Sequence, residues 1–409
     1  MAVSVPYLTD LFDLVDDRSL RQKAEKFLDA VWADWAVEQL NGVRGGAKTR
    51  VKDGNNWNGA MYKQARFYFG GEGSAERHYF TQLLSDFELK PIIWSMALDR
   101  HGLGEFGYVS RKPGEAENKR PRPLGTERSM LTDTESRLVR YSWITPDYIM
   151  GSQMDHPSAV HSHLSAQARW LGITFKGENG PRIYPTDVVN TEGWTNEHAL
   201  LRAVQHENVM LVQQARRWFQ INPAWYPAKT MTRNDFSIYI GDSHDRVVEK
   251  QGWLFVEHGD AFAAVRVVIG NDEATPGLQS ALVEDSYRWS ADNKRIILND
   301  KYAGMIFETS RRAHHKNLEA FMDDILDNPL VLEKTVVAGF NILRYRGSGE
   351  DAEEIYFNLA NNEISMIGGE RLNYAPEMLF ESPYIKSEYK SGIIEITKGD
   401  RELILDFNK

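Results

Sequence analysis

Cysteine is absent from the 409-residue chain, which excludes disulfide bonds, thiolate metal sites and a cysteine nucleophile. No run of about 18 apolar residues occurs, so we expect no membrane-spanning helix and no membrane partner. The N-terminal stretch MAVSVPYLTDLFDLVDD lacks the basic and apolar regions of a signal peptide. We therefore expect a soluble protein, cytoplasmic as the sequence stands and periplasmic or secreted if a leader once preceded Met1.

Positive charge is in deficit, because 48 Lys and Arg residues stand against 58 Asp and Glu residues, for a formal charge of −10. A nucleic-acid-binding protein needs a basic face to displace counterions from phosphates, so we exclude nucleic acid as a partner. The chain also lacks a glycine-rich nucleotide-binding motif, a Walker-type loop and a G-x-S-x-G elbow. Nucleotide use and serine-hydrolase chemistry therefore have no support in the sequence.

Aromatic residues are abundant: 11 Trp, 17 Tyr and 18 Phe make up 11% of the chain. Aromatic rings fill protein cores, and they also serve as stacking platforms for flat or amphipathic ligands. Composition alone does not separate these two uses.

The first hundred residues have the periodicity of helices. Over 19–40, apolar residues recur every three to four positions, with Ser19 as the predicted N-cap, Gln22 completing a capping box and Gly42 as the helix stop. Shorter helices are predicted over 58–69, 75–87 and 91–98.

From residue 106 onward, strand signals dominate. Residues 137–152 alternate and are rich in β-branched and aromatic side chains. Hairpin turns are predicted at Gly259-Asp260, Gly368-Gly369 and Gly399-Asp400, and one short helix over 315–326. The order of helices before strands predicts an α+β protein, with a helical part over 1–105 and a large antiparallel β-sandwich over 106–409.

The densest group of candidate catalytic residues lies in residues 155–170, DHPSAVHSHLSAQARW. On a strand, His161 and His163 would point to the same face, where they could share a metal ion or act as general base and substrate-orienting group. The alternative is a pair of surface histidines without a catalytic role. An amide, a cation and an aromatic platform follow at Gln167, Arg169 and Trp170.

A second candidate is the basic segment 41–58, NGVRGGAKTRVKDGNNWN. In an acidic protein, such a segment could hold an anionic sugar by charge and stacking; the alternative is a solvated loop between helices. Its candidate ligand-binding residues are Arg44, Lys48, Arg50, Lys52, Asn55, Asn56 and Trp57. Tyr62 and Arg66, four residues apart on the next predicted helix, share one face and could border the same cleft.

The stretch HSHLSAQARWLG at 161–172 resembles the β-domain histidine motif of heparinase II/III-like polysaccharide lyases. Four further segments are similar to carbohydrate-active proteins of that kind: YSWITPDYIMGS, KQGWLFVEHGDAFAAVRVV, MIFETSRRAHHKNLEAFMDDILDN and NGVRGGAKTR. The resemblance implies a partial (α/α) toroid joined to an antiparallel β-sandwich, with the active site between them. Leu164 and Ser165 stand where such proteins carry an acidic residue, so we assign no metal ligand.

The resemblance implies β-elimination at a uronic acid of a polysaccharide or oligosaccharide, with no cofactor required; a structural divalent ion has no support in the sequence. The implied roles are His161 as base or carboxylate-neutralising group, His163 as its support, and Tyr148 or Tyr62 as acid. Arg44, Arg50, Asn56 and Arg169 would bind the carboxylate, and Trp57 and Trp170 would stack on sugar rings. Two alternatives stay open: a glycoside hydrolase with paired carboxylates, and a glycan-binding protein without catalysis.

Overall fold

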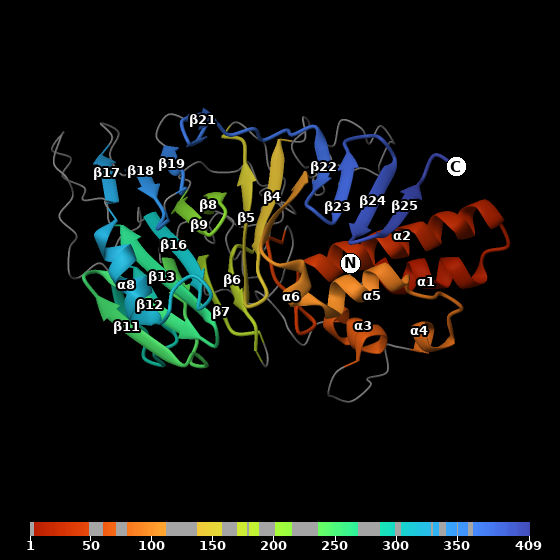
Figure 1. Cartoon of the computed structure of the whole chain (residues 1–409), viewed down its shortest axis with the longest axis horizontal. Coiled ribbons are helices and arrows are strands. Elements are labelled where there is room, and N and C mark those ends of the chain that lie inside the picture. The colour runs from red at the N-terminus through yellow and green to blue at the C-terminus, as the bar shows by residue number, and fades with distance from the viewer. Residues whose placement is uncertain are drawn as a thin grey trace, which may run out of the picture.

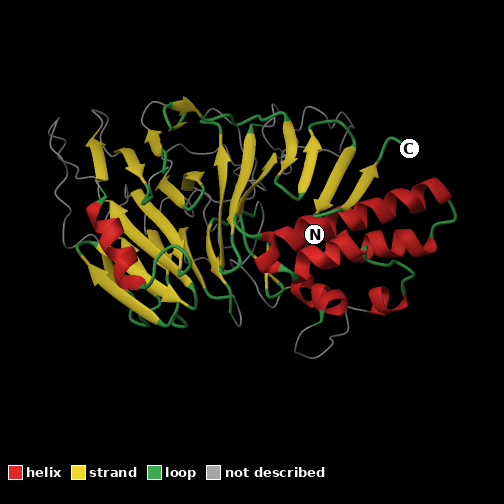
Figure 2. Cartoon of the chain, viewed as in Figure 1, coloured by secondary structure: helices red, strands yellow, loops and turns green. Residues whose placement is uncertain are grey.

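The computed structural model describes residues 4–48, 60–70, 80–111, 137–157, 170–177, 180–187, 201–214, 236–268, 287–298, 304–328, 330–334, 341–349, 351–358 and 363–409. Figure 2 shows most of the helices gathered at one end of the molecule, with strands beside them, and one helix among the strands at the other end. All strand pairs between named strands of the described part are antiparallel. The predicted α+β class with antiparallel sheets is therefore confirmed.

The helices of the N-terminal part are α1 (Ser4–Leu14), α2 (Arg18–Val37), α3 (Ala60–Phe69), α4 (Phe80–Leu84), α5 (Pro91–Leu98) and α6 (Arg100–Leu103). None of the helices in the described ranges combines the length and apolar character that crossing a membrane requires.

Helix α2 begins and ends differently from the prediction. Its N-cap is Asp17, whose carboxylate accepts from the amides of Ser19 (2.8 Å) and Leu20 (3.1 Å), so the predicted Ser19 cap is wrong. The helix ends at Val37 because the chain turns into a short hairpin, β1 (Gln39–Leu40) and β2 (Val43–Arg44). The two turn residues, Asn41 and Gly42, both have positive φ, which suits a tight hairpin turn and not a helix.

A twelve-stranded sheet runs through the molecule (Figure 1) in the order β14, β15, β10, β7, β6, β5, β4, β3, β22, β23, β24, β25. Its strands are β3 (Phe106–Arg111), β4 (Leu138–Ile144), β5 (Tyr148–Asp155), β6 (Gly172–Phe175), β7 (Arg182–Asp187), β10 (Phe236–Tyr239), β14 (Tyr287–Trp289), β15 (Arg295–Leu298), β22 (Met378–Glu381), β23 (Ile385–Glu388), β24 (Ile393–Lys398) and β25 (Arg401–Asp406). The segment 137–152 is therefore mostly a hairpin of two strands, β4 and β5.

Two smaller sheets complete the β part. The six-stranded sheet has the order β11, β12, β13, β16, β9, β8, and the five-stranded sheet runs from β17 to β21 in sequence order. Their strands are β8 (Leu201–His206), β9 (Val209–Gln214), β11 (Arg246–Lys250), β12 (Trp253–His258), β13 (Ala261–Val268), β16 (Gly304–Arg311), β17 (Leu330–Lys334), β18 (Asn341–Arg346), β19 (Glu354–Asn358), β20 (Met366–Ile367) and β21 (Glu370–Arg371).

The predicted local elements of the β part are confirmed. Strands β12 and β13 meet at Gly259-Asp260, β20 and β21 at Gly368-Gly369, and β24 and β25 at Gly399-Asp400. The predicted helix over 315–326 is α8 (Leu318–Asp327), capped by Asn317, whose side chain accepts from the Ala320 amide at 2.9 Å.

Most of the buried apolar residues in the described part form three clusters. One fills the space between the twelve-stranded and six-stranded sheets and includes Met150, Ile173 and Phe307. The second packs the other face of the six-stranded sheet against α8 and the five-stranded sheet. The third joins the N-terminal helices to Ile385, Ile396 and Leu405 of the last strands, so the helices over 1–105 share a core with the C-terminal end of the chain. Figure 1 shows β24 and β25 beside α2.

Candidate functional site

The segment after β2 crosses the twelve-stranded sheet at very close range. A Cβ atom added to Gly151 of β5 would lie 2.3 Å from the backbone nitrogen of Ala47, and one added to Gly45 would lie 2.7 Å from Cβ of Ile149. Gly46 has φ +70°, a conformation that side chains with a Cβ rarely adopt. The glycines of the basic segment therefore allow its backbone to lie directly on β5.

The crossing segment ends in a pairing between the two regions that the sequence singled out. The Lys48 amide donates to the Trp170 carbonyl at 3.1 Å, and the Trp170 amide donates to the Lys48 carbonyl at 2.9 Å. Lys48 belongs to the basic segment 41–58, and Trp170 ends the histidine-containing segment 155–170. The two predicted candidate regions therefore meet at these residues, although they are more than a hundred positions apart in sequence.

A buried network of charges fixes the base of this crossing. An Nη atom of Arg44 lies 2.6 Å from Oδ2 of Asp34 and 2.7 Å from Oε2 of Glu38, and Arg140 of β4 lies 2.9 Å from the same Glu38 oxygen. The Tyr108 hydroxyl donates to Oδ1 of Asp34 at 2.8 Å. Burial alone would raise the pKa of Asp34, but Arg44 and Arg140 outweigh burial and hold that pKa below its usual value. Arg44 therefore forms ion pairs with Asp34 of α2 and with Glu38, the C-cap residue of that helix.

Lys48 lies at the positively charged end of this network. Its Nζ is 4.8 Å from the ring centroid of Trp170, which is fully buried. Burial, together with the charges of Arg44 and Arg182, lowers the pKa of Lys48 well below its usual value. Among the described residues, three guanidinium groups, Arg44, Arg140 and Arg182, stand against the two carboxylates Asp34 and Glu38, so the local potential is positive.

The structure describes five of the predicted site residues in full, and Lys48 has been placed above. Tyr148 is 1% exposed in the core between the two larger sheets, and burial raises the pKa of its hydroxyl above the usual value. Trp170 is likewise a core side chain, and Arg44 is held by carboxylates, so direct contact of these three with a sugar has no support in their surroundings. Arg66 lies in the last turn of α3.

The other predicted site residues are described in part or not at all. Tyr62 lies on α3, but its side chain is outside the described residues. The remaining predicted residues lie outside the described ranges: Arg50, Lys52, Asn55, Asn56, Trp57, His161, His163, Gln167 and Arg169.

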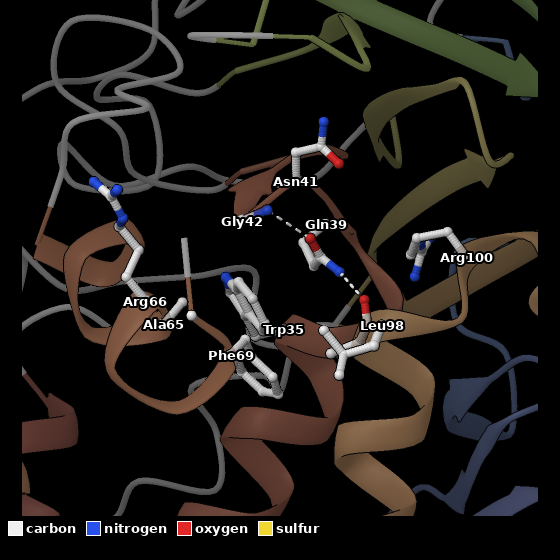
Figure 3. A pocket seen from close by; sticks show the side chains of 11 residues that line it. Trp35, Gln39, Asn41, Gly42, Ala65, Arg66, Phe69, Leu98 and Arg100 are labelled. Carbon is white, nitrogen blue, oxygen red and sulfur yellow. Dashed lines mark hydrogen bonds between the residues drawn. The ribbon is translucent and has the colours of Figure 1, made fainter. Parts of the chain in front are cut away.

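A cavity of about 310 Å³ lies on the other side of the β1–β2 hairpin, between α2, α3 and α5 (Figure 3). Its lining residues are Trp35, Gln39, Asn41, Gly42, Ala65, Arg66, Phe69, Gly70, Ala97, Leu98 and Arg100. The rings of Trp35 and Phe69 stack at 4.8 Å with an interplanar angle of 18°. Gln39 closes the hairpin end, since its side chain donates to the Ala97 carbonyl at 2.6 Å and accepts from the Gly42 amide at 2.8 Å.

Sequence reasoning singled out Arg66, and Asn41 and Gly42 as part of segment 41–58, but none of the other lining residues. Trp35 fitted the apolar periodicity of α2, so it carried no separate signal. Arg100 is the first residue of the four-residue helix α6, and only the fold places it beside the cavity. Within the described ranges, no group of three or more His, Asp or Glu side chains is arranged to hold a metal ion.

Comparisons with protein-family models, curated proteins and solved structures found nothing that matches this chain.

Proposed function

We propose that the protein cleaves a uronate-containing polysaccharide by β-elimination, at the place where residues 41–48 cross the twelve-stranded sheet. The observation that carries this proposal is the backbone pairing of Lys48 with Trp170. That pairing supports the proposal because it joins the basic segment 41–58 to the histidine-containing segment 155–170. Among the described residues it also lies beside more guanidinium groups than carboxylates, which suits an acidic sugar.

The reaction needs three groups. A cation or hydrogen-bond donor neutralises the uronate carboxylate, which makes the neighbouring C–H bond acidic. A base takes that proton, a carbon–carbon double bond forms, and the bond to the leaving sugar oxygen breaks. An acid protonates this oxygen as it leaves.

In this proposal His161 is the base or neutralising group, with His163 as its support. We prefer Tyr62 to Tyr148 as the acid, because Tyr148 is only 1% exposed and lies in a core. No metal ion or other cofactor is required, since histidine and tyrosine supply both proton transfers.

The remaining residues would bind substrate. Lys48, Arg50, Asn56 and Arg169 would hold the carboxylate, whereas Arg44 would stabilise the hairpin beneath them through Asp34 and Glu38. Trp57 would stack on a sugar ring, and Gln167 and Arg66 would border the cleft. The proposal also makes the helices α1 to α6 part of an (α/α) toroid.

The test is incubation of the full chain with a panel of uronate polysaccharides, including alginate, hyaluronan, heparan sulfate and pectate. We expect ultraviolet absorbance from an unsaturated product with at least one of them, in the presence of a chelator as well as without it. Absence of absorbance across the panel contradicts the lyase proposal.

The same assay separates the alternatives. A glycoside hydrolase would release reducing ends without ultraviolet absorbance, and a glycan-binding protein would be retarded in affinity electrophoresis without turnover. Among the described residues, Asp34 and Glu38 are a carboxylate pair beside the site, but both are paired with Arg44, and the pKa of Asp34 is held below its usual value. A hydrolase needs one carboxylic acid with a raised pKa, so this pair does not favour hydrolysis.

His161→Ala tests the assignment of the base. We expect the rate to fall by roughly 10²- to 10⁴-fold, the usual effect of removing a general acid or base. His101→Ala is the matched control, because His101 is an exposed histidine of α6. Equal activities of the two variants would remove His161 from the mechanism.

A further inference from the structure

One face of the twelve-stranded sheet carries a row of three aromatic rings. The ring centroids of Trp170 and Tyr184 are 6.1 Å apart, and those of Tyr184 and Tyr239 are 5.0 Å apart. Tyr184 and Tyr239 lie directly opposite each other on β7 and β10, whereas their neighbours Ile183 and Ile238 belong to the core between the two larger sheets. Because side chains alternate between the faces of a sheet, the row lies on the face that points away from that core.

A basic side chain lies at each end of this row. Nζ of Lys48 is 4.8 Å from the ring centroid of Trp170, and Cζ of Arg295 on β15 is 5.1 Å from that of Tyr239. Trp170 and Tyr184 are buried, whereas Tyr239 and Arg295 are half-buried. The row therefore leads from the crossing segment to the surface, and a ligand can contact it at Tyr239 and Arg295.

Arg288 of the edge strand β14 adds a second guanidinium group to the same face. It lies opposite Ile297 of β15, which is two positions from Arg295, so both arginine side chains leave the sheet on one face. The neighbours of Arg288, Tyr287 and Trp289, pack against the core on the other face, and Arg288 itself is exposed. The two guanidinium groups therefore belong to diagonal neighbours on adjacent strands, at the open end of the row.

Neither guanidinium group has a carboxylate partner in the described part of the chain. Two carboxylates of the adjoining turns are engaged elsewhere, because Asp242 lies 2.6 Å from Nζ of Lys294 and Asp292 accepts from the Lys294 amide at 3.2 Å. Arg295 contacts the ring of Tyr239 instead. Such a contact orders a guanidinium group without using its N–H donors, so these donors stay available to an acceptor.

We propose that Arg288 and Arg295 bind carboxylate groups of an acidic polysaccharide, on the part of its chain that extends beyond the place where residues 41–48 cross the sheet. The inference rests on the proposed function for the kind of ligand, and it adds a binding surface away from the cleaved bond. A guanidinium group holds a carboxylate through two parallel hydrogen bonds. Exposed ion pairs are weak one by one, so two of them on an open face suit a chain of repeated carboxylates better than a small acid.

Affinity electrophoresis of the full chain, in gels that contain alginate, hyaluronan, heparan sulfate or pectate, measures this binding without requiring turnover. The test variant carries Arg288→Ala and Arg295→Ala together. We expect at least one polymer to retard the parent protein, and the double variant to bind that polymer about tenfold more weakly at low salt. Where the polymer is also cleaved, KM should rise by the same factor while kcat stays the same, because neither residue touches the reacting atoms.

The matched control is a double variant with Arg371→Ala and Arg401→Ala. It loses the same charge from two exposed arginines, one on β21 of the five-stranded sheet and one on β25, the edge strand at the other end of the twelve-stranded sheet. It should bind the polymer as the parent does. A further variant, Arg288→Lys with Arg295→Lys, keeps the charge but loses the planar fork, and should bind with intermediate affinity. Circular dichroism of each variant checks its folding.

Three results would each overturn the proposal: no polymer retards the parent, the variant lacking Arg288 and Arg295 binds as the parent does, or the control variant loses as much affinity. Failure of the lyase proposal is distinguishable from these. Retardation that depends on Arg288 and Arg295 without any unsaturated product supports this surface and contradicts only the cleavage. Product formed with the same KM by the parent and the variant supports the cleavage and contradicts this surface.

Discussion

Asp29 is a buried carboxyl group of α2 that lowers stability near neutral pH. It is 2% exposed, and Oδ1 has no hydrogen-bond partner among the described residues. Burial raises the pKa of Asp29 to about 7, although Lys90 acts in the opposite direction. The folded protein therefore binds a proton that the unfolded chain releases near pH 4, so the free energy of unfolding falls as pH rises from about 4 to about 7.

Asp29→Asn should remove this dependence. We expect the variant to be more stable than the parent at pH 8, by up to about 4 kcal/mol, and nearly equal to it at pH 4, where Asp29 is already neutral. Urea unfolding at the two pH values measures both differences. Asp10→Asn is the control, because Asp10 is an aspartate of α1 that is not fully buried. A stability difference that is the same at pH 4 and pH 8 would contradict the prediction.

Lys48 makes the free energy of unfolding change with pH in the direction opposite to that of Asp29. Its pKa is lowered in the folded protein, so at pH 7 the folded state disfavours the charge that the unfolded chain carries. Lys48→Met should therefore increase the free energy of unfolding at pH 7, by about 1 kcal/mol for each unit of pKa depression, and this gain should disappear toward pH 10.5.

The same substitution should weaken the binding of uronate oligosaccharides, because it removes a hydrogen-bond donor beside Trp170. Lys250→Met, on edge strand β11, is the matched control and should change neither property by much, since exposed ion pairs contribute little. Unchanged oligosaccharide affinity in Lys48→Met would argue against a carboxylate site at this position.

At the scale of elements, the crossing of residues 45–47 over β5 depends on Gly151. Because a Cβ at this position would overlap the backbone of Ala47, Gly151→Ala must displace either β5 or the segment 45–47. We expect a loss of roughly 2–4 kcal/mol in unfolding free energy and faster amide exchange over 43–48. The control is Gly259→Ala, which has positive φ but open space around the added Cβ, and should cost about 1 kcal/mol. A smaller loss for Gly151→Ala than for Gly259→Ala would show that the crossing tolerates a side chain.

The elements that sequence reasoning predicted are those whose signals are local. The turn at Gly399-Asp400 and the helix α8 each depend on a few adjacent residues, and the structure has both. The end of α2 was mispredicted because Asn41-Gly42 can end a helix or turn a hairpin, and the contacts that decide come from elsewhere in the fold.

The site was harder to predict because its contacts join distant positions. Nothing near Lys48 in sequence indicates Trp170, and nothing near Glu38 indicates Arg140. The basic segment and the histidine segment could each be recognised, whereas their meeting point and the buried state of Tyr148 depend on the packing of whole sheets.

At the scale of the whole molecule, the last strands connect the two ends of the chain. Glu381 of β22 pairs with Val109 of β3, and Ile396 and Leu405 join the core of the N-terminal helices. Polar contacts reinforce this packing, since Lys398 lies 2.9 Å from Asp99, just after α5. The helices and the C-terminal strands should therefore unfold as one unit, although they lie at opposite ends of the sequence.

Two substitutions of fully buried isoleucines test this coupling. Ile396→Ala, in β24, and Ile325→Ala, in α8, each leave a cavity and should each cost about 2–5 kcal/mol. Hydrogen exchange read by mass spectrometry should show faster exchange in α2 and α5 for Ile396→Ala. For Ile325→Ala it should show faster exchange in α8 and β18, because Ile325 belongs to the core between the six-stranded and five-stranded sheets. If α2 and α5 keep their protection in Ile396→Ala, the helices are stable without the C-terminal strands, and the shared core does not unite the two ends.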